Sequence, residues 1–452
     1  MELNSIAYTR RSSIRKVLAN FVQIDYILAV NKLHILFLSL LVFALLSYKL
    51  TQPFWGHHEF NGVFYGMIAK NYLRYGILQT RGAQVTNLSP TTPSQWSFHT
   101  NHPATFPLLL SLFFALFGPY EYVSRLISIV ASIVAVVVLG RLISSIFQTP
   151  LSWLAAVLIL FSPLFLYYGS LPVFEPILFP VVVFGLYIFW KSQRSPRLVL
   201  IAVSCILASV IDWPGFWLPV WLIVYELATQ KRKRVLLTLL GSIAVALAII
   251  LTHQLIAYGS LESVVAVGRY RLGVTSQPYT PIAWLRLLLS RTRAFLGLPI
   301  IIASAIGFVV ALRKRKRQAF FFLAAALGIG ISHIFVFRNV TWYHDYMLYH
   351  LLPFVGLALG SLFHALYVKT RSALAVVAVF SVIVLTTVSS THAFFTALVN
   401  LTPHEDCVEM GYQVRRRSEL QTFQLTSEKA KECPPFIGFY GEKPFEVKIK
   451  DQ

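Results

Sequence analysis

Acidic residues are scarce in this sequence. Of its 452 residues, Asp and Glu make up 18 and Lys and Arg make up 39, so the formal net charge is +21. Charged residues together are 13% of the chain and hydrophobic residues are 56%, whereas a soluble domain carries about 25% charged residues. This shortage of charge excludes a soluble globular protein and indicates a polytopic membrane protein.

The sequence also lacks a continuous basic surface of the kind that binds nucleic acid. Its basic residues come as short clusters between apolar runs, and Arg-Lys-Arg-Lys-Arg at 313–317 is the clearest of them. Such clusters are typical of cytoplasmic loops under the positive-inside rule. We therefore expect the lipid bilayer, and no nucleic acid, among the partners of this protein.

Three further absences restrict the interpretation. The first apolar run is not followed by a small-residue cleavage site, so it predicts a retained spanning helix rather than a signal peptide. No internal repeat of the kind found in inverted-repeat transporters is present. Cysteines number only 3. Cys205 lies in an apolar run, whereas Cys407 and Cys433 lie in the polar tail, where they could form a disulfide if that tail is extracytoplasmic.

Long apolar runs are what the sequence has in abundance. A spanning helix needs about 20 apolar residues. Runs near that length occur at 34–50, 122–146, 151–169, 173–190, 197–212, 214–229, 234–257, 294–312, 318–337, 346–367 and 372–393. The sequence thus predicts an all-α polytopic membrane protein with about 11 transmembrane helices. The two short runs at 197–212 and 214–229 are separated only by Trp213.

The basic clusters also predict an orientation. With the N-terminus in the cytoplasm, every strong basic cluster falls on the cytoplasmic side. This divides the chain into a basic cytoplasmic N-terminus (1–33), a transmembrane domain (34–393) and a small extracytoplasmic C-terminal segment (394–452). Within the domain, residues 51–121 form a large first extracytoplasmic loop with short interfacial helices. We expect the plasma membrane as the location.

The first outer loop places a carboxylate at the start of a predicted helix. Glu59 follows His57 and His58, and apolar residues from Phe60 to Leu73 recur at close to helical spacing. The free backbone N–H groups and the dipole of a helix start stabilise a carboxylate. On this stretch alone, a helix-start charge is the simpler interpretation of Glu59.

Three more acids fall at helix ends on the same predicted face. They are Glu175, Asp212 and Asp345. A charge at membrane depth is costly unless it meets a wet cavity or a partner. Together with Glu59, these acids could therefore converge on one cavity, or each could be an interface residue exposed to water. Pro176 directly follows Glu175, which suits the first turn of a helix.

Histidines are concentrated in the same outer loop, at His57, His58, His99 and His102. Their spacing matches no strong zinc signature such as His-Glu-x-x-His. We therefore expect no cofactor and do not favour a divalent metal. His102 precedes an apolar stretch too short for a span, which predicts an interfacial or re-entrant helix. Its side chain would either position a phosphate or cap that helix.

The motifs of this loop are similar to those of a known family. Glu59 is followed by Asn-Gly-x-x-Tyr, ending at Tyr65, and then by Ile-Ala-Lys-Asn-x-Leu-x-x-Gly, which contains Lys70. His102-Pro103 is followed by Pro-Leu-Leu, and Glu121 and Arg125 open the second apolar run. His344-Asp345-Tyr346 precedes a late apolar run in the same way.

This pattern resembles the first extracytoplasmic loop of membrane glycosyltransferases of the GT-C superfamily. The most similar branch is glycosyltransferase family 39-like, related to protein O-mannosyltransferases and to lipid A aminoarabinose transferase. The likeness extends over about residues 30–390 in layout, and the first loop is its specific part. One departure is that many members carry Asp at the first acidic position, where this chain has Glu59.

The resemblance implies a hexosyl- or pentosyl-transferase acting outside the membrane. The donor would be a sugar on a polyprenyl phosphate, and the acceptor would be a hydroxyl of a protein, lipid or glycan. Glu59 would act as general base in an inverting reaction, with Glu175 as a second catalytic carboxylate. The departing phosphate is an anion and needs nearby cations or N–H donors.

The substrate-binding residues that the resemblance and the outer-face charges predict are His58, Asn61, Tyr65, Lys70, His102, Asp212, Arg269, Arg271, Arg338, His344 and Asp345. For each arginine the alternative is contact with lipid headgroups at the interface.

Two other functions were weighed against the transferase. A transporter or flippase of a lipid-linked or small solute would need charges near the middle of the bilayer and broken helices. The acids here lie at helix ends on one side, which favours the enzyme. A scaffold protein that keeps the fold without catalysis would be indicated by loss of the first acid, but Glu59 is present.

Overall fold

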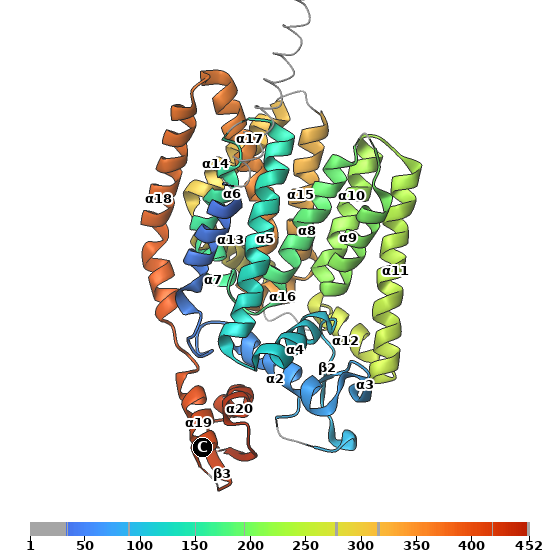
Figure 1. The fold of residues 1–452 in the computed structure, drawn as a ribbon, viewed down its shortest axis with the longest axis vertical. Helices are drawn as coiled ribbons and strands as arrows, with labels where there is room; N and C mark the ends of the chain where they lie inside the picture. Colours follow the sequence, from blue (N-terminus) through green and yellow to red (C-terminus); the bar gives the residue numbers. More distant parts are fainter. Residues whose placement is uncertain are drawn as a thin grey trace, which may run out of the picture.

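The computed structural model describes residue 33 and residues 35–449, except 89–90, 150, 194, 276–278, 314–316 and 418. The predicted N-terminal segment up to residue 32 and the middle of the basic cluster at 313–317 lie outside the described residues. Long helices run side by side as a bundle, and short helices and a small C-terminal unit cover one end of it (Figure 1).

The long helices of the bundle are α5 (Glu121–Phe147), α8 (Phe174–Lys191), α9 (Leu198–Ile211), α10 (Trp217–Ala228), α11 (Lys233–Tyr258), α14 (Leu298–Arg313), α15 (Arg317–Val336), α17 (Leu352–Thr370) and α18 (Ala373–Asn400). Helix α5 packs against α8, and α14 packs against α17. These contacts build an apolar core that extends from the bundle into the short helices.

Short elements gather at the end of the bundle that is lower in Figure 1. They are α2 (Phe60–Tyr75), α3 (Ile77–Thr80), β1 (Gln84–Val85), β2 (Phe98–His99), α4 (Thr105–Phe117), α12 (Glu262–Arg271) and α16 (Arg338–Tyr343). Strands β1 and β2 pair antiparallel, with Gln84 opposite His99. As predicted, a short helix follows Glu59 and another follows His102.

Several predicted spans are broken helices. The run at 151–169 is α6 (Leu154–Leu158), η3 (Ile159–Phe161) and α7 (Pro163–Tyr168). The break falls at Ser162, whose extended backbone caps α7 through a bond from the Phe165 N–H, before a proline at the first helical position. The remaining short pieces are η1 (Ser47–Lys49), η2 (Pro93–Gln95), η4 (Trp213–Phe216), η5 (Asp345–Leu351) and α13 (Pro281–Leu296).

The run at 294–312 is likewise divided. Helices α13 and α14 meet at an angle of 98°. The bend falls at Gly297, whose φ of 79° is a conformation that residues with a side chain rarely adopt. Among the described residues, 6 helices are long and apolar enough to cross a membrane, or 7 if this bent pair is one span. The structure therefore confirms a mostly helical, multi-pass membrane architecture but not a count of about 11.

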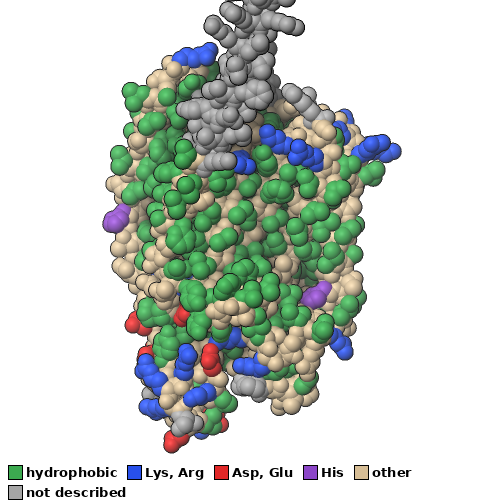
Figure 2. All heavy atoms as spheres, viewed as in Figure 1, with side chains coloured by type: hydrophobic (Ala, Val, Ile, Leu, Met, Phe, Trp, Pro, Cys, Tyr) green, Lys and Arg blue, Asp and Glu red, His purple; other side chains and the backbone are tan. Residues whose placement is uncertain are grey.

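Charge is segregated along the bundle. Figure 2 shows hydrophobic side chains over the middle of one face and Lys and Arg at the end where α17 meets α18. Acidic side chains appear on this face only toward the opposite end, together with further Lys and Arg. This distribution agrees with a cytoplasmic basic end and an outer end that carries the acids.

The C-terminal segment is a small αβ unit, as predicted for an appended structure. It consists of α19 (Glu405–Arg416), β3 (Gln421–Leu425), α20 (Lys429–Gly441) and β4 (Phe445–Ile449), and the two strands pair in parallel. Cys407 and Cys433, whose pairing the sequence leaves open, form a disulfide between α19 and α20. Helix α20 packs against α2, which attaches the unit to the first loop.

The disulfide provides a test of orientation. We expect Cys407 and Cys433 to be oxidised in cells, because disulfides persist in extracytoplasmic compartments and are rare in the cytosol. Thiol-reactive polyethylene glycol should therefore add to these two positions only after reduction, as read from the mass shift on a denaturing gel. A Cys407→Ser/Cys433→Ser variant is the control. Labelling without reductant would place the tail in the cytoplasm.

Candidate functional site

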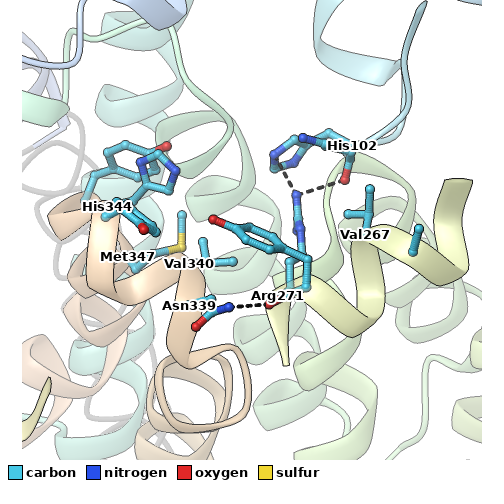
Figure 3. A pocket seen from close by; sticks show the side chains of 12 residues that line it. His102, Val267, Arg271, Asn339, Val340, His344 and Met347 are labelled. Atoms are coloured by element: carbon cyan, nitrogen blue, oxygen red, sulfur yellow. Dashed lines mark hydrogen bonds between the residues drawn. The ribbon is translucent and has the colours of Figure 1, made fainter. Parts of the chain in front are cut away.

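A cavity of about 350 Å³ lies where α12, α16 and the start of η5 meet the segment before α4. The residues that line it are Asn101, His102, Ala266, Val267, Tyr270, Arg271, Asn339, Val340, Tyr343, His344, Tyr346 and Met347. In Figure 3, His102 and Arg271 stand together on one side of the pocket, and His344 and Met347 lie across from them. Three of the predicted binding residues therefore share one cavity.

One wall of the cavity is a chain of three polar side chains. Arg271 donates from Nη2 to Nε2 of His102 (2.9 Å) and to the carbonyl oxygen of Asn101 (2.9 Å). Because Nε2 of His102 accepts this bond, its Nδ1 carries the proton and donates to Oδ1 of Asp212 at 2.7 Å. The ring of His102 also stacks on Phe174, with centroids 4.7 Å apart. The chain holds the Arg271 guanidinium, which is only 7% exposed, in the cavity wall.

The environment of His102 in this wall, and of His99 near it, favours the neutral form of each ring. Burial lowers the pKa of His102, and Arg271 lowers it further, although Asp212 opposes them. Burial likewise lowers the pKa of His99, to about 3, with His102 and Arg271 adding to the effect. A neutral His102 is what the bond from Arg271 requires. The alternative that His102 caps α4 is wrong, because α4 begins at Thr105 and its N-cap is Ala104.

The other two predicted edge acids lie close to the same cavity. Glu175, at the start of α8, is buried and interacts electrostatically with Asp212 and Arg271. Asp345 is buried directly beside His344 and Tyr346, which line the cavity. Three of the four predicted carboxylates therefore lie near the cavity on separate elements, although none of them is among the described residues that line it.

Asp345 holds two histidines of the first loop. Nε2 of His57 lies 3.1 Å from Oδ2, and Nε2 of His58 lies 3.2 Å from Oδ1. The hydroxyl of Tyr168 donates to Oδ1 as well. The ring of His58 packs against His344 and Tyr346, at centroid distances of 5.7 and 5.0 Å. The predicted residues His58, His344 and Asp345 thus form one cluster beside the cavity.

Glu59 is the predicted residue whose environment differs most from expectation. Its side chain is 2% exposed and is not among the described residues that line the cavity. Oε1 lies 2.9 Å from Nη2 of Arg125 and 3.9 Å from Nζ of Lys49. Oε2 accepts the backbone N–H of Gly56 at 2.7 Å. Each oxygen therefore has a partner within the protein, and the role of Glu59 as a general base stays a prediction.

Two other predicted binding residues point away from the cavity. Lys70 donates to the carbonyl of Phe439 (2.7 Å) and to Oε1 of Glu442 (3.0 Å), so it anchors the C-terminal unit instead. Arg269 is exposed on α12. Neither of them, nor Arg338, is among the described residues that line the cavity. The structure does not bring Lys70 to the cavity, because its ammonium group has two partners in the C-terminal unit.

Asn61 and Tyr65 support the site without lining the cavity. The Asn61 side chain interacts with Tyr346. Tyr65 is 6% exposed and packs edge-on against Phe174 and His102. Sequence reasoning missed Asn339, whose amide donates to the Tyr270 carbonyl at 2.6 Å and thereby joins α16 to α12. In the sequence this asparagine is marked only by the short sequon Asn-Val-Thr at 339–341, which does not point to a place in the site.

The fold of this chain is similar to that of solved membrane glycosyltransferases. The structure of ArnT from Cupriavidus metallidurans bound to undecaprenyl phosphate matches with a TM-score of 0.63 and 12% identity, over 91% of this chain and 85% of that chain. The apo state of the same protein gives a TM-score of 0.58. The Archaeoglobus fulgidus oligosaccharyltransferase in complex with Zn and sulfate gives 0.57 at 14% identity, over 91% of this chain and 62% of that chain.

Within this class, residues 101–257 match the family model described as dolichyl-phosphate-mannose-protein mannosyltransferase. No curated protein matches the sequence. The resemblance to the GT-C superfamily that the first loop predicts is confirmed by these findings. The matched segment contains His102, Glu175 and Asp212, whereas Glu59 and Arg271 lie outside it.

The ion pair of Glu59 generates a stability prediction. In Glu59→Gln, the buried guanidinium of Arg125 loses its counter-charge. Breaking a buried pair from one side costs about 3–5 kcal/mol. We expect a lower apparent melting temperature of the purified protein in detergent. Glu409→Gln is the control, because it breaks a pair with Arg416 whose members are 53% and 71% exposed. An unchanged melting temperature would argue that Glu59 has only a catalytic role.

The low pKa of His99 generates a pH prediction. Histidine in an unfolded chain has a pKa near 6.5. Because the native pKa of His99 is about 3, the unfolded state binds a proton that the native state excludes, so stability falls as pH drops below 6.5. The His99→Phe variant removes the imidazole but keeps an aromatic ring to pack on Phe64. As the pH falls from about 7 to 5, thermal melts should show a smaller loss of stability for the variant than for the wild type, by up to about 2 kcal/mol. Equal losses would contradict this account.

Proposed function

We propose that this protein transfers a sugar from a polyprenyl-phosphate carrier to an acceptor hydroxyl at the extracytoplasmic face of the plasma membrane. The observation that carries the proposal is Arg271, a buried arginine held in the wall of a cavity at one end of an apolar helix bundle. An apolar bundle suits a lipid tail, and a buried arginine suits its phosphate. The undecaprenyl phosphate bound to ArnT, which shares the fold, supports the same class of donor.

Arg271 would bind the phosphate of the donor and of the departing carrier. A planar guanidinium has five N–H donors, and it binds phosphate through two of them at once. Its Nη2 is bonded to His102 and Asn101, which fixes the plane of the group. Because it is buried, its charge is weakly screened and acts strongly on an anion that develops in the transition state.

The acceptor would be activated on the opposite side of the cavity. There His344 and Tyr346 stand in front of the cluster formed by His57, His58 and Asp345. Figure 3 shows His344 across the pocket from His102 and Arg271. An acceptor that enters from one side while phosphate leaves from the other inverts the configuration of the sugar. We therefore assign acceptor activation to this cluster rather than to Glu59.

Glu59 and Glu175 retain roles in this scheme. Glu59 holds the turn that carries His57 and His58, through its bond to the Gly56 N–H, and so acts as a positioning residue. Glu175 stays our proposed second carboxylate, because both Arg271 and Tyr346 in the cavity wall interact with it electrostatically.

The proposal predicts the effect of removing Arg271. In Arg271→Ala, transfer of a radiolabelled hexose or pentose from polyprenyl phosphate to native membrane acceptors should fall by about 10²-fold or more, the usual effect of losing one preorganised donor. Arg269→Ala is the matched control, since that exposed arginine lies on the same helix outside the cavity.

Two outcomes would contradict the transferase. Equal activity of wild type and Arg271→Ala would remove the phosphate-binding role. Movement of the labelled carrier across proteoliposome membranes, with no sugar transferred to any acceptor, would favour the transporter or flippase instead.

A further inference from the structure

We propose that His57, His58 and Asp345 bind one divalent transition-metal ion, of the chemical class of Zn²⁺. The three side chains come from a turn of the first loop and from the start of η5. One donor atom from each lies within 4.8 Å of the others. The inference adds to the proposed function a way in which this cluster could activate an acceptor, but ion binding itself can be tested without any transfer reaction.

The spacing of the donor atoms suits tetrahedral coordination. Zinc binds imidazole nitrogen and carboxylate oxygen at about 2.0–2.2 Å, so neighbouring ligand atoms in a tetrahedron are about 3.3 Å apart. Nε2 of His57 is 3.1 Å from Oδ2 of Asp345, and Nε2 of His58 is 3.2 Å from Oδ1. Small rotations of these side chains would direct all three donor atoms at one ion.

Hydrogen bonds do not satisfy one of these donor atoms. Nε2 of His58 is buried and has no partner in hydrogen-bond geometry among the described residues, although Oδ1 of Asp345 is close. That oxygen already accepts a bond from the Tyr168 hydroxyl. A buried polar atom without a partner costs about 1–3 kcal/mol. A cation between the nitrogen lone pair and the carboxylate would satisfy both groups.

The backbone holds the two histidines in a conformation that few sequences adopt. His58 has a φ of 57°, in the left-handed region that residues other than glycine seldom occupy. The turn brings the rings of His57 and His58 to 4.0 Å between centroids, and both reach the same carboxylate. The hydroxyl of Tyr167 donates to the His57 carbonyl at 2.8 Å, and the Asn61 N–H donates to the His58 carbonyl at 3.2 Å. The ligands are thus preorganised before an ion binds.

The composition of the site also indicates which ions it would take. Two imidazoles and one carboxylate favour ions that accept nitrogen ligands, whereas Mg²⁺ and Ca²⁺ prefer oxygen. The hydroxyl of Tyr168 supports the carboxylate, as outer-shell groups do in known metal sites. His57 is 29% exposed, which gives an ion a route of entry. Three protein ligands leave a position open for an oxygen of water or substrate.

Such an ion would lie beside His344 and Tyr346 in the cavity wall, on the side away from Arg271. A bound Zn²⁺ lowers the pKa of an attached oxygen and thereby produces a nucleophile at neutral pH. The acceptor hydroxyl would be that oxygen ligand: it would lose its proton to water, its oxygen would bond to the anomeric carbon, and the bond from that carbon to the carrier phosphate would break.

Metal binding to the purified full-length protein tests the inference. The protein should carry a tag without histidines, be stripped with a chelator, and be titrated with Zn²⁺ by calorimetry. We expect one equivalent to bind to the wild type. His58→Ala and Asp345→Asn should lose it, whereas His99→Phe, which changes a histidine of the same loop outside the cluster, should keep it. Co²⁺ in place of Zn²⁺ should give the intense visible absorption of a four-coordinate ion.

The outcomes separate this inference from the proposed function. Equal zinc binding by the wild type and Asp345→Asn, or no binding by either, overturns the metal site. If His58→Ala does not fold, as judged by its gel-filtration profile, Asp345→Asn and the cobalt spectrum of the wild type still decide the question. A protein that transfers sugar without binding metal overturns this inference alone. A protein that binds metal but transfers nothing overturns the proposed function alone.

Discussion

The buried ion pair between Glu59 and Arg125 is the interaction on which the arrangement of the site depends. Arg125 is 1% exposed on α5, and it also donates to the carbonyl oxygens of Gln52 and Pro53. One guanidinium therefore ties the start of the first loop to the bundle. Through Oε2 of Glu59, the same pair fixes the turn that begins at Gly56 and presents His57 and His58. A side chain at position 56 would collide with this carboxylate, since a Cβ there would lie 2.9 Å from Oε2.

A second constraint explains why the polar residues of the cavity occur as connected chains. Near a membrane, a buried charge is tolerated only with a partner. Arg271 donates a hydrogen bond to His102, and His102 donates one to Asp212. The histidine between the two charges is neutral. This leaves a cation in the cavity wall whose charge is not cancelled by direct contact with a carboxylate. An anionic ligand would meet that guanidinium with little competition.

The sequence predicts the parts of this molecule that depend on local pattern. Apolar periodicity predicts the helix after Glu59, and the short apolar stretch after His102 predicts α4. The basic clusters predict an orientation of the bundle. The number of spans is not settled by apolar length, because Ser162, Pro163 and Gly297 divide apolar runs that are continuous in composition.

Pairings between distant segments are the part that the sequence does not reveal. Glu59 and Arg125 are 66 positions apart, and His57 and Asp345 are 288 positions apart. The motif that contains Glu121 and Arg125 was visible at the start of the second apolar run, but nothing local shows that its arginine meets Glu59. The partners of Lys70 are hidden from the sequence for the same reason, because they lie in the C-terminal unit, 369 and 372 positions away.

The bonds of its carboxylate explain why position 59 carries glutamate, where many GT-C proteins carry aspartate. Its two oxygens divide their bonds between Arg125 on the bundle and the N–H of Gly56 on the turn. Aspartate is one methylene shorter and, from the same helix start, would reach less far toward the guanidinium. A carboxylate whose length is matched to two structural partners is poorly placed to accept a proton as well. The longer acid thus matches its two structural partners and supports the turn that carries His57 and His58.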